Sequence, residues 1–104
     1  MHAGEYVGAI KFARKALDLA TTIGYALIVA AATDTIAQIR SRQGDLAGAA
    51  REAEEAGRLF LEIGAAPRAA ASLEIAAKAW EGLGETERAR SVTERARLLT
   101  PATP

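Results

Sequence analysis

The sequence lacks cysteine, holds a single histidine and three prolines, and has few aromatic residues, which make up 5% of its 104 residues. The absence of cysteine excludes disulfide bonds and thiolate metal sites, and it fits a reducing cytoplasm. The longest apolar run covers only residues 25–32 and is too short to cross a bilayer, and no secretory leader pattern opens the chain. We therefore expect a cytoplasmic protein that does not associate with a membrane.

The sequence also lacks a net charge, because thirteen basic residues balance thirteen acidic ones. Nothing therefore draws the whole molecule to nucleic acid. His2 lies at a terminus, whereas general-base chemistry needs a held geometry. Glu54 and Glu55 alternate with Arg51 and Arg58, which is typical of an ion-paired surface rather than of an acid/base pair. We expect no enzymatic activity, no cofactor, no metal and no nucleic-acid partner.

What the sequence does have is glycine at a regular spacing and alanine at about a quarter of all positions. An acidic residue follows every second one of these glycines, so the repeat is 40 residues long and consists of two unlike halves. The repeats start at residues 4, 44 and 84. The five regularly spaced glycines are Gly4, Gly24, Gly44, Gly64 and Gly84.

Between the glycines, apolar residues recur every three or four positions, which predicts amphipathic helices. Glycine at each junction favours the left-handed conformation that ends a helix, and Pro67 suits a first helical turn. The chain 1–104 is predicted to form one domain with a flexible tail at residues 100–104. The predicted helices cover residues 5–23, 26–42, 45–63, 67–82 and 85–99.

The first of these segments resembles the second helix of a tetratricopeptide repeat, in which glycine, an acid and an aromatic residue precede small residues seven apart. Here Gly4, Glu5 and Tyr6 precede Ala9 and Ala16, and the small columns recur one and two repeats later. Small residues in such columns let neighbouring helices approach closely. The resemblance implies an all-α, tetratricopeptide-like solenoid of five helices in antiparallel pairs, wound as a right-handed superhelix.

The 40-residue period is similar to the longer-helix tetratricopeptide repeats of bacterial regulators, including large ATP-dependent transcriptional activators. By that resemblance the chain is expected to be a non-catalytic protein–protein interaction module and a segment of a larger regulatory or signalling protein. The expected partner is a protein or a peptide.

In tetratricopeptide arrays the first helices of the pairs line a concave surface that contacts peptides. The resemblance places one set of candidate binding residues on two such helices, although an ordinary solvated surface is the competing interpretation. These candidates are Asp34, Gln38, Ser41, Arg42, Glu74, Lys78 and Glu81.

A second hypothesis is a homodimer, because the helix over residues 5–23 is expected to lack its usual partner helix. Its apolar stripe would then dock onto a symmetric copy. The candidate residues for this contact are Tyr6, Ile10, Ala13 and Leu17, while Phe12 and Leu19 form a second, narrower apolar edge. Trp80, the only tryptophan, is expected to anchor the core rather than to serve as an exposed ligand platform.

Overall fold

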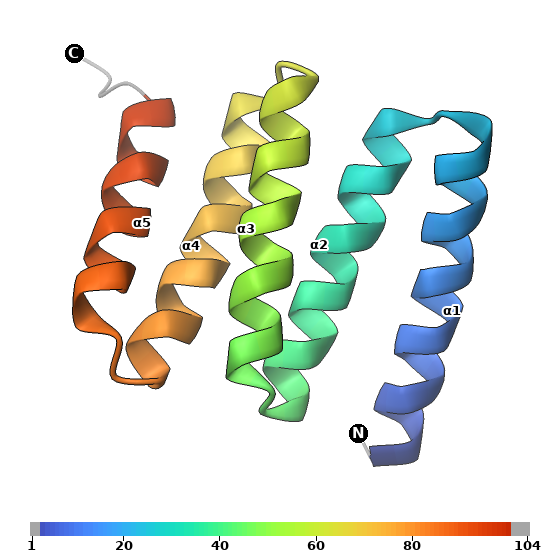
Figure 1. Ribbon diagram of the computed structural model, residues 1–104, viewed down its shortest axis with the longest axis horizontal. Coiled ribbons are helices and arrows are strands. Elements are labelled where there is room, and N and C mark those ends of the chain that lie inside the picture. The colour runs from blue at the N-terminus through green and yellow to red at the C-terminus, as the bar shows by residue number, and fades with distance from the viewer. Residues whose placement is uncertain (1–2, 101–104) are drawn as a thin grey trace.

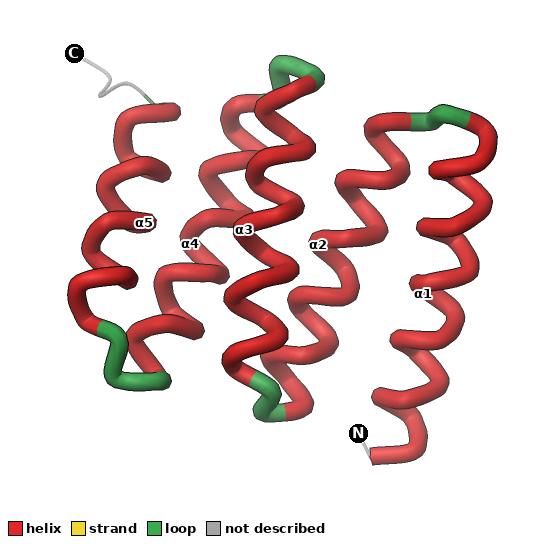
Figure 2. Tube along the Cα trace, in the orientation of Figure 1, coloured by secondary structure: helices red, strands yellow, loops and turns green. Residues whose placement is uncertain are grey.

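The computed structural model describes residues 3–100, and within that range it contains only α-helices and short turns (Figures 1 and 2). The all-α class expected from the sequence is therefore confirmed. Apart from Thr100, the predicted tail lies outside the described residues, as does His2. The helices are α1 (Ala3–Ile23), α2 (Ala26–Gln43), α3 (Leu46–Glu62), α4 (Ala66–Gly82) and α5 (Thr86–Leu99), and their ends lie within two residues of the predicted ones.

Successive helices run antiparallel and stand in a row from α1 to α5 (Figure 1). The described chain measures 42 × 33 × 19 Å. Besides successive neighbours, only α2 and α4 bring their Cα atoms within 8 Å of each other. The backbone of α1 therefore lies close to that of α2 alone and the backbone of α5 close to that of α4 alone, whereas α3 has a close neighbour on both sides. The two ends of the row each leave one helix side open.

The turns repeat one geometry every twenty residues. Gly24, Gly44, Gly64 and Gly84 have φ between 77° and 89°, which only glycine adopts without strain. The N–H of the following residue donates to the carbonyl five positions back, for example from Asp45 to Arg40 at 2.9 Å. This bond satisfies a carbonyl that the helix end would otherwise leave unpaired. The regular spacing of glycine thus fixes where each helix ends and where the chain turns back.

The core is built mainly from alanine, with a few larger side chains between the helices. Phe60, Ile36, Leu73 and Val92 are the largest fully buried apolar residues. At Gly57 of α3 an added Cβ would lie 2.9 Å from a methyl group of Leu73, so the close contact between α3 and α4 requires glycine there. Small residues on α3 therefore let α4 approach, as the sequence pattern suggested.

Polar side chains connect helices that lie two apart in the row. Ser72 of α4 donates to Asp34 of α2 at 2.7 Å, and Arg14 of α1 forms a 3.4 Å ion pair with Glu52 of α3. Glu54 of α3 accepts hydrogen bonds from the Trp80 indole at 2.8 Å and from Arg95 of α5 at 3.1 Å. Trp80 itself is 6% exposed, which confirms that it belongs to the core.

Candidate functional site

Exposed apolar side chains gather at the α1 end of the row. Phe12 is 79% exposed, Leu19 61% and Ile23 59%. Two adjoining hollows of about 430 and 270 Å³ lie between α1 and α2 and share Ala16 as a lining residue. We call this surface the apolar end face, and no charged side chain lines either hollow. It is formed by Ala9, Phe12, Ala13, Ala16, Leu19, Ala20 and Ile23 from α1 and by Tyr25, Ile28, Ala32, Thr35 and Ile39 from the start and body of α2.

The repeat shows what covers the same positions one step along the row. Forty residues after Ala16 and Ala20 stand Ala56 and Phe60, which are fully buried in a cluster with Ala30 of α2 and Ala69 of α4. In that second repeat α2 lies on the surface formed by α3 and α4. At the α1 end no described helix occupies the equivalent place.

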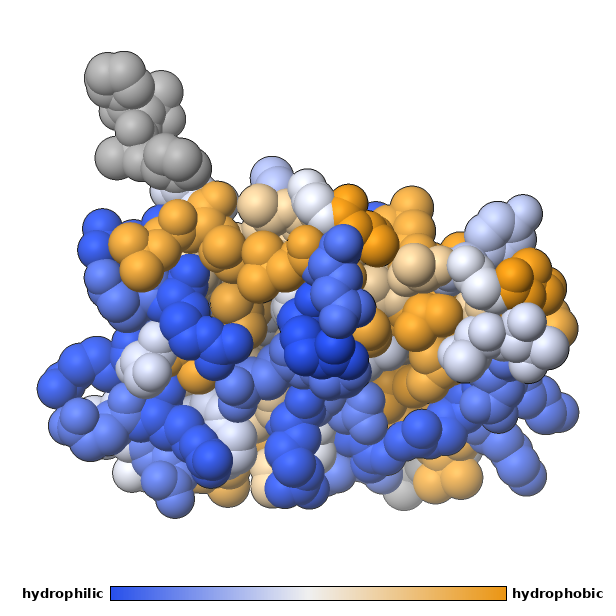
Figure 3. Space-filling model, turned by 45° about the horizontal axis from the view of Figure 1, so that its top comes forward, coloured by the Kyte–Doolittle hydropathy of each residue, from blue (hydrophilic) through white to orange (hydrophobic). Residues whose placement is uncertain are grey.

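Further apolar side chains lie along the edge that carries the α1–α2 and α3–α4 turns. Figure 3 shows hydrophobic residues gathered along this edge, with hydrophilic residues over most of the remaining view. Tyr25, Leu61, Ile63 and Leu98 are among the exposed large apolar side chains of this region. The edge is narrower than the apolar end face and continues it at Ile23 and Tyr25.

The side chains predicted to line a concave surface lie on α2 and on α4, and most of them are exposed. Asp34 is the exception, because it is half-buried and accepts hydrogen bonds from Gln38 and Ser72, each at 2.7 Å. Its carboxylate therefore ties α2 to α4. The remaining predicted residues, Ser41, Arg42, Glu74, Lys78 and Glu81, are solvent-exposed.

The four residues proposed for self-association are not the exposed apolar side chains of α1. Ala13 is 8% exposed, and Tyr6, Ile10 and Leu17 are half-buried. Since α2 is the only helix that packs against α1, these residues form the side of α1 that turns toward α2. The exposed stripe is the neighbouring one, which carries Phe12 and Leu19.

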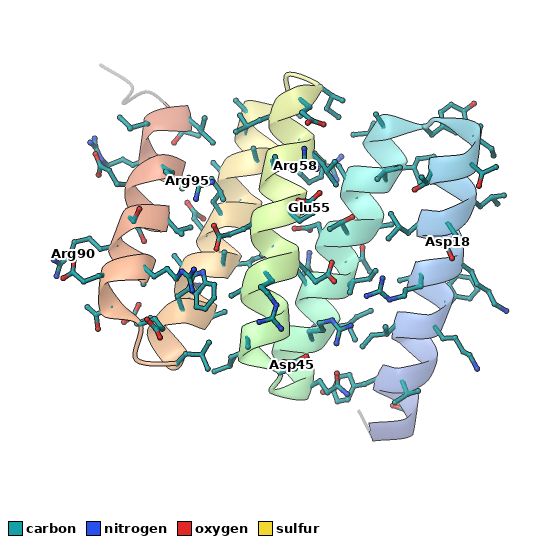
Figure 4. The ribbon with its side chains drawn as sticks, in the orientation of Figure 1. Asp18, Asp45, Glu55, Arg58, Arg90 and Arg95 are labelled. Atoms are coloured by element: carbon teal, nitrogen blue, oxygen red, sulfur yellow. The ribbon has the colours of Figure 1, made fainter. Side chains whose placement is uncertain are left out.

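A polar cleft of about 440 Å³ lies between α3 and α5, with Trp80 of α4 among its lining residues. Arg88 stacks on the Trp80 ring at 4.3 Å, and Arg51 lines the opposite side. Figure 4 shows that Arg90 and Arg95 leave α5 on different sides, Arg90 away from the rest of the molecule and Arg95 toward α4. Sequence reasoning missed this cleft, because its residues meet only when α4 packs between α3 and α5.

Ion pairs dominate the electrostatics of α3. Arg58 donates to Glu55 and to Glu62, and the hydrogen bond from Arg58 lowers the pKa of Glu55. The same contacts raise the pKa of Arg58. The pairing of Glu55 with Arg58 agrees with the charge pattern, whereas Glu52 and Glu54 pair with Arg14 of α1 and Arg95 of α5 rather than with an arginine of their own helix.

Residues 3–100 contain neither a cluster of metal-binding side chains nor a helix that could span a membrane. No group of three or more His, Cys, Asp or Glu side chains in residues 3–100 has an arrangement that would hold a metal ion. Over the same residues, none of the helices combines the length and the apolar character that a bilayer crossing requires.

Comparison with known proteins does not assign this chain to a family. No protein-family model matches the chain, and no match is found among curated proteins or solved structures.

Proposed function

We propose that this chain is a non-catalytic protein–protein interaction module, built as a tetratricopeptide-like right-handed solenoid and forming a segment of a bacterial regulatory protein. Its binding surface is the apolar end face, and the partner contributes an amphipathic helix. The alternation of two helix types with a 40-residue period and the contact between α2 and α4 support the solenoid.

One observation carries the binding proposal: no described helix covers the apolar end face, whereas α2 covers its counterpart one repeat later. Ala56 is completely buried beneath the counterpart contact, while Ala16 is exposed. Since α2 fills the counterpart site, the chemistry that fits the apolar end face is that of a helix with small and apolar residues on one side. Contiguous apolar surface of this kind marks interaction sites on proteins in water.

The expected affinity follows from the side chains that a partner would cover. Fully burying Phe12, Leu19 and Ile23 contributes about 1.5–3 kcal/mol each, against an association cost of about 4–15 kcal/mol. Additional burial of the alanines and of Ile28 raises the total only modestly. A dissociation constant of about 1–100 µM corresponds to about 5.5–8 kcal/mol, so it requires that the partner helix bury apolar side chains of its own in the same contact.

A library of displayed peptides that form amphipathic helices tests this proposal. The peptides should be selected by the wild-type chain, and Leu19→Glu should abolish their binding by placing a charge within the apolar end face. Val7→Glu is the matched control, because Val7 is 59% exposed on the same helix and lines neither hollow. Equal binding by both variants, with helical content unchanged by circular dichroism, would refute the apolar end face as the site.

The surface of α2 and α4 is a second candidate for partner contact. Asp34 and Ser72 join these helices, and the exposed Gln38 and Lys78 occupy corresponding columns one repeat apart. Gln38→Ala and Lys78→Ala should weaken the binding of any partner that uses this surface. Unchanged binding of every recovered partner would exclude it.

A further inference from the structure

We propose that the apolar end face binds the same face of a second copy of this chain, with the two α1 helices antiparallel and a two-fold axis at Ala16. This inference rests on the proposed function, since it names the partner of that surface. It uses Phe12, Leu19 and Ile23 as the contact residues in place of the more buried stripe through Ile10 and Leu17.

The exposed stripe of α1 is complementary to itself in this arrangement. When two copies of α1 run antiparallel with Ala16 facing Ala16, each residue meets the partner residue that makes the two numbers sum to 32. Phe12 then stands at the level of the partner's Ala20, and Leu19 stands at the level of the partner's Ala13. Both alanines are largely buried beside α2 and line the hollows that these large side chains would enter. Each level pairs one large side chain with one small one, so the helices approach closely without a gap or a clash.

The third pair of facing residues also combines one large side chain with one small one. Ile23 stands at the level of the partner's Ala9, and both positions belong to the apolar end face. The only level with two small residues is the centre, where Ala16 meets its own copy. A parallel pair would instead place Phe12 beside Phe12 and leave the alanines facing one another, so the antiparallel arrangement distributes volume more evenly.

The other side of the interface comes from α2. A two-fold axis places both copies of α2 on one side of the α1 pair, where Ile28 and Ile39 extend the apolar surface. The result is a four-helix arrangement of α1 and α2 from each copy. Its core continues the alanine-rich packing seen between α2, α3 and α4.

Charge decides against a head-to-tail contact between copies. The outer side of α5 exposes Thr86, Arg90, Thr93 and Arg97, and a shallow hollow there is lined by Glu81 and Arg90. Covering these charged groups with the apolar end face would desolvate them without providing partners. The apolar end face therefore matches its own copy better than it matches the opposite end, and the assembly closes as a dimer.

Sedimentation and a cross-linking pattern test the dimer. The wild-type chain should be dimeric at about 100 µM, and Leu19→Glu should raise the dissociation constant at least a hundredfold, about 2.7 kcal/mol, while Val7→Glu leaves it unchanged. Leu19 is 61% exposed, so its substitution should leave the helical content intact, which circular dichroism checks. A monomeric wild-type chain at this concentration would overturn the inference.

Cysteine substitutions report the register, because the chain contains no cysteine of its own. Ala16→Cys should form a disulfide dimer on mild oxidation, since residues on the two-fold axis come within the Cα separation of about 4.4–6.8 Å that a disulfide requires. Ile23→Cys should not link to itself but should link to Ala9→Cys when the two variants are mixed. Val7→Cys serves as the control that should remain monomeric. Self-linking of Ile23→Cys without linking of Ala16→Cys would overturn the antiparallel register.

The two proposals fail in distinguishable ways. If the chain is monomeric and Ala16→Cys does not link, but helical peptides still bind and Leu19→Glu blocks them, the second copy is wrong and the interaction module stands. If neither copies nor peptides bind, both are wrong.

Discussion

The two ends of the helix row follow one sequence template but present opposite surfaces. On α3, the side that faces α4 carries Leu46, Ala50 and Gly57, and the positions forty residues later on α5 carry Thr86, Arg90 and Arg97. The outer side of α5 is therefore polar where an interior helix is apolar. At the other end α1 keeps Phe12, Leu19 and Ile23 exposed. The open side of α5 is therefore polar, and the open side of α1 is apolar.

This contrast shows that one set of residues determines the repeat pattern and another set determines whether the open side at each end of the row is polar or apolar. Glycines and columns of small residues set the helix pairs along the row, and both ends share them. The side chains on the open face of the last helix determine whether that face is solvated or binds something. A polar outer side keeps a helix such as α5 solvated, whereas contiguous apolar surface of the kind seen on α1 is typical of interaction sites.

The largest expected effect comes from comparing a covered phenylalanine with an uncovered one. Phe60 is 1% exposed beneath α2, whereas Phe12 is 79% exposed on the apolar end face. Phe60→Ala should lower the free energy of unfolding by about 3–5 kcal/mol, because it leaves a cavity. Phe12→Ala should change it by less than about 0.5 kcal/mol in the monomer. Urea denaturation at low protein concentration measures both, and similar losses would contradict the contrast.

A second test replaces polar side chains on the outer side of α5 with apolar ones. The combined variant Thr86→Leu, Arg90→Ala and Thr93→Ala gives α5 the residues that α3 has at the same columns. We expect self-association at least tenfold stronger than in the wild type, about 1.4 kcal/mol, because the new surface can cover an apolar face of another copy. Sedimentation velocity over a concentration series measures this. Replacing the exposed Ser91 with alanine is the control, and an unchanged sedimentation profile of the triple variant would show that side-chain polarity does not close this end.

The sequence predicted the helices and their turns because those signals are local. A glycine with positive φ follows each of the first four helices, and this signal needs no information from distant residues. The exposed apolar stripe of α1 was harder to predict, because two apolar stripes lie side by side on that helix. Ile10 and Leu17 are turned toward α2, and only the packing of α2 decides that Phe12 and Leu19 remain outside. The spacing of Phe12 and Leu19, seven residues apart, was the available signal.

The sequence pattern did not predict which side chains connect α3 to α4 and α5. Glu54 belongs to a run of charges that predicts a solvated surface, yet it accepts hydrogen bonds from both Trp80 and Arg95. Its role depends on where α4 and α5 lie relative to α3. The periodicity predicts that such helices are near, but it does not specify which charged side chain faces inward.

A smaller effect is expected from the hydrogen bond that joins α2 to α4. Ser72 is fully buried and donates to Asp34, whereas its counterpart at the apolar end is Ala32. Ser72→Ala should cost about 1 kcal/mol of stability, because it removes one buried hydrogen bond. Ala32→Ser should bring no gain, since no described carboxylate covers that position. Thermal unfolding of the two variants measures the difference, and a stabilising Ala32→Ser would mean that the apolar end already has a polar partner in solution.

The smallest expected effect concerns the ion pair that helps to keep the α5 end polar. Arg97 donates to Glu94 through its Nε at 3.0 Å and through a second guanidinium nitrogen, and these hydrogen bonds lower the pKa of Glu94. A carboxyl whose pKa is lower in the folded state stabilises that state above its unfolded pKa, and the contribution is lost as the pH falls through the folded pKa. Glu94→Gln should therefore speed amide hydrogen exchange in the last turns of α5 at neutral pH, and the variant should match the wild type at a pH well below the folded pKa. Because both side chains are solvent-exposed, the effect should shrink at high salt. Exchange in α1 should be unaffected at any pH, and a change there would mean that the two ends are coupled through the row rather than set independently by their own side chains.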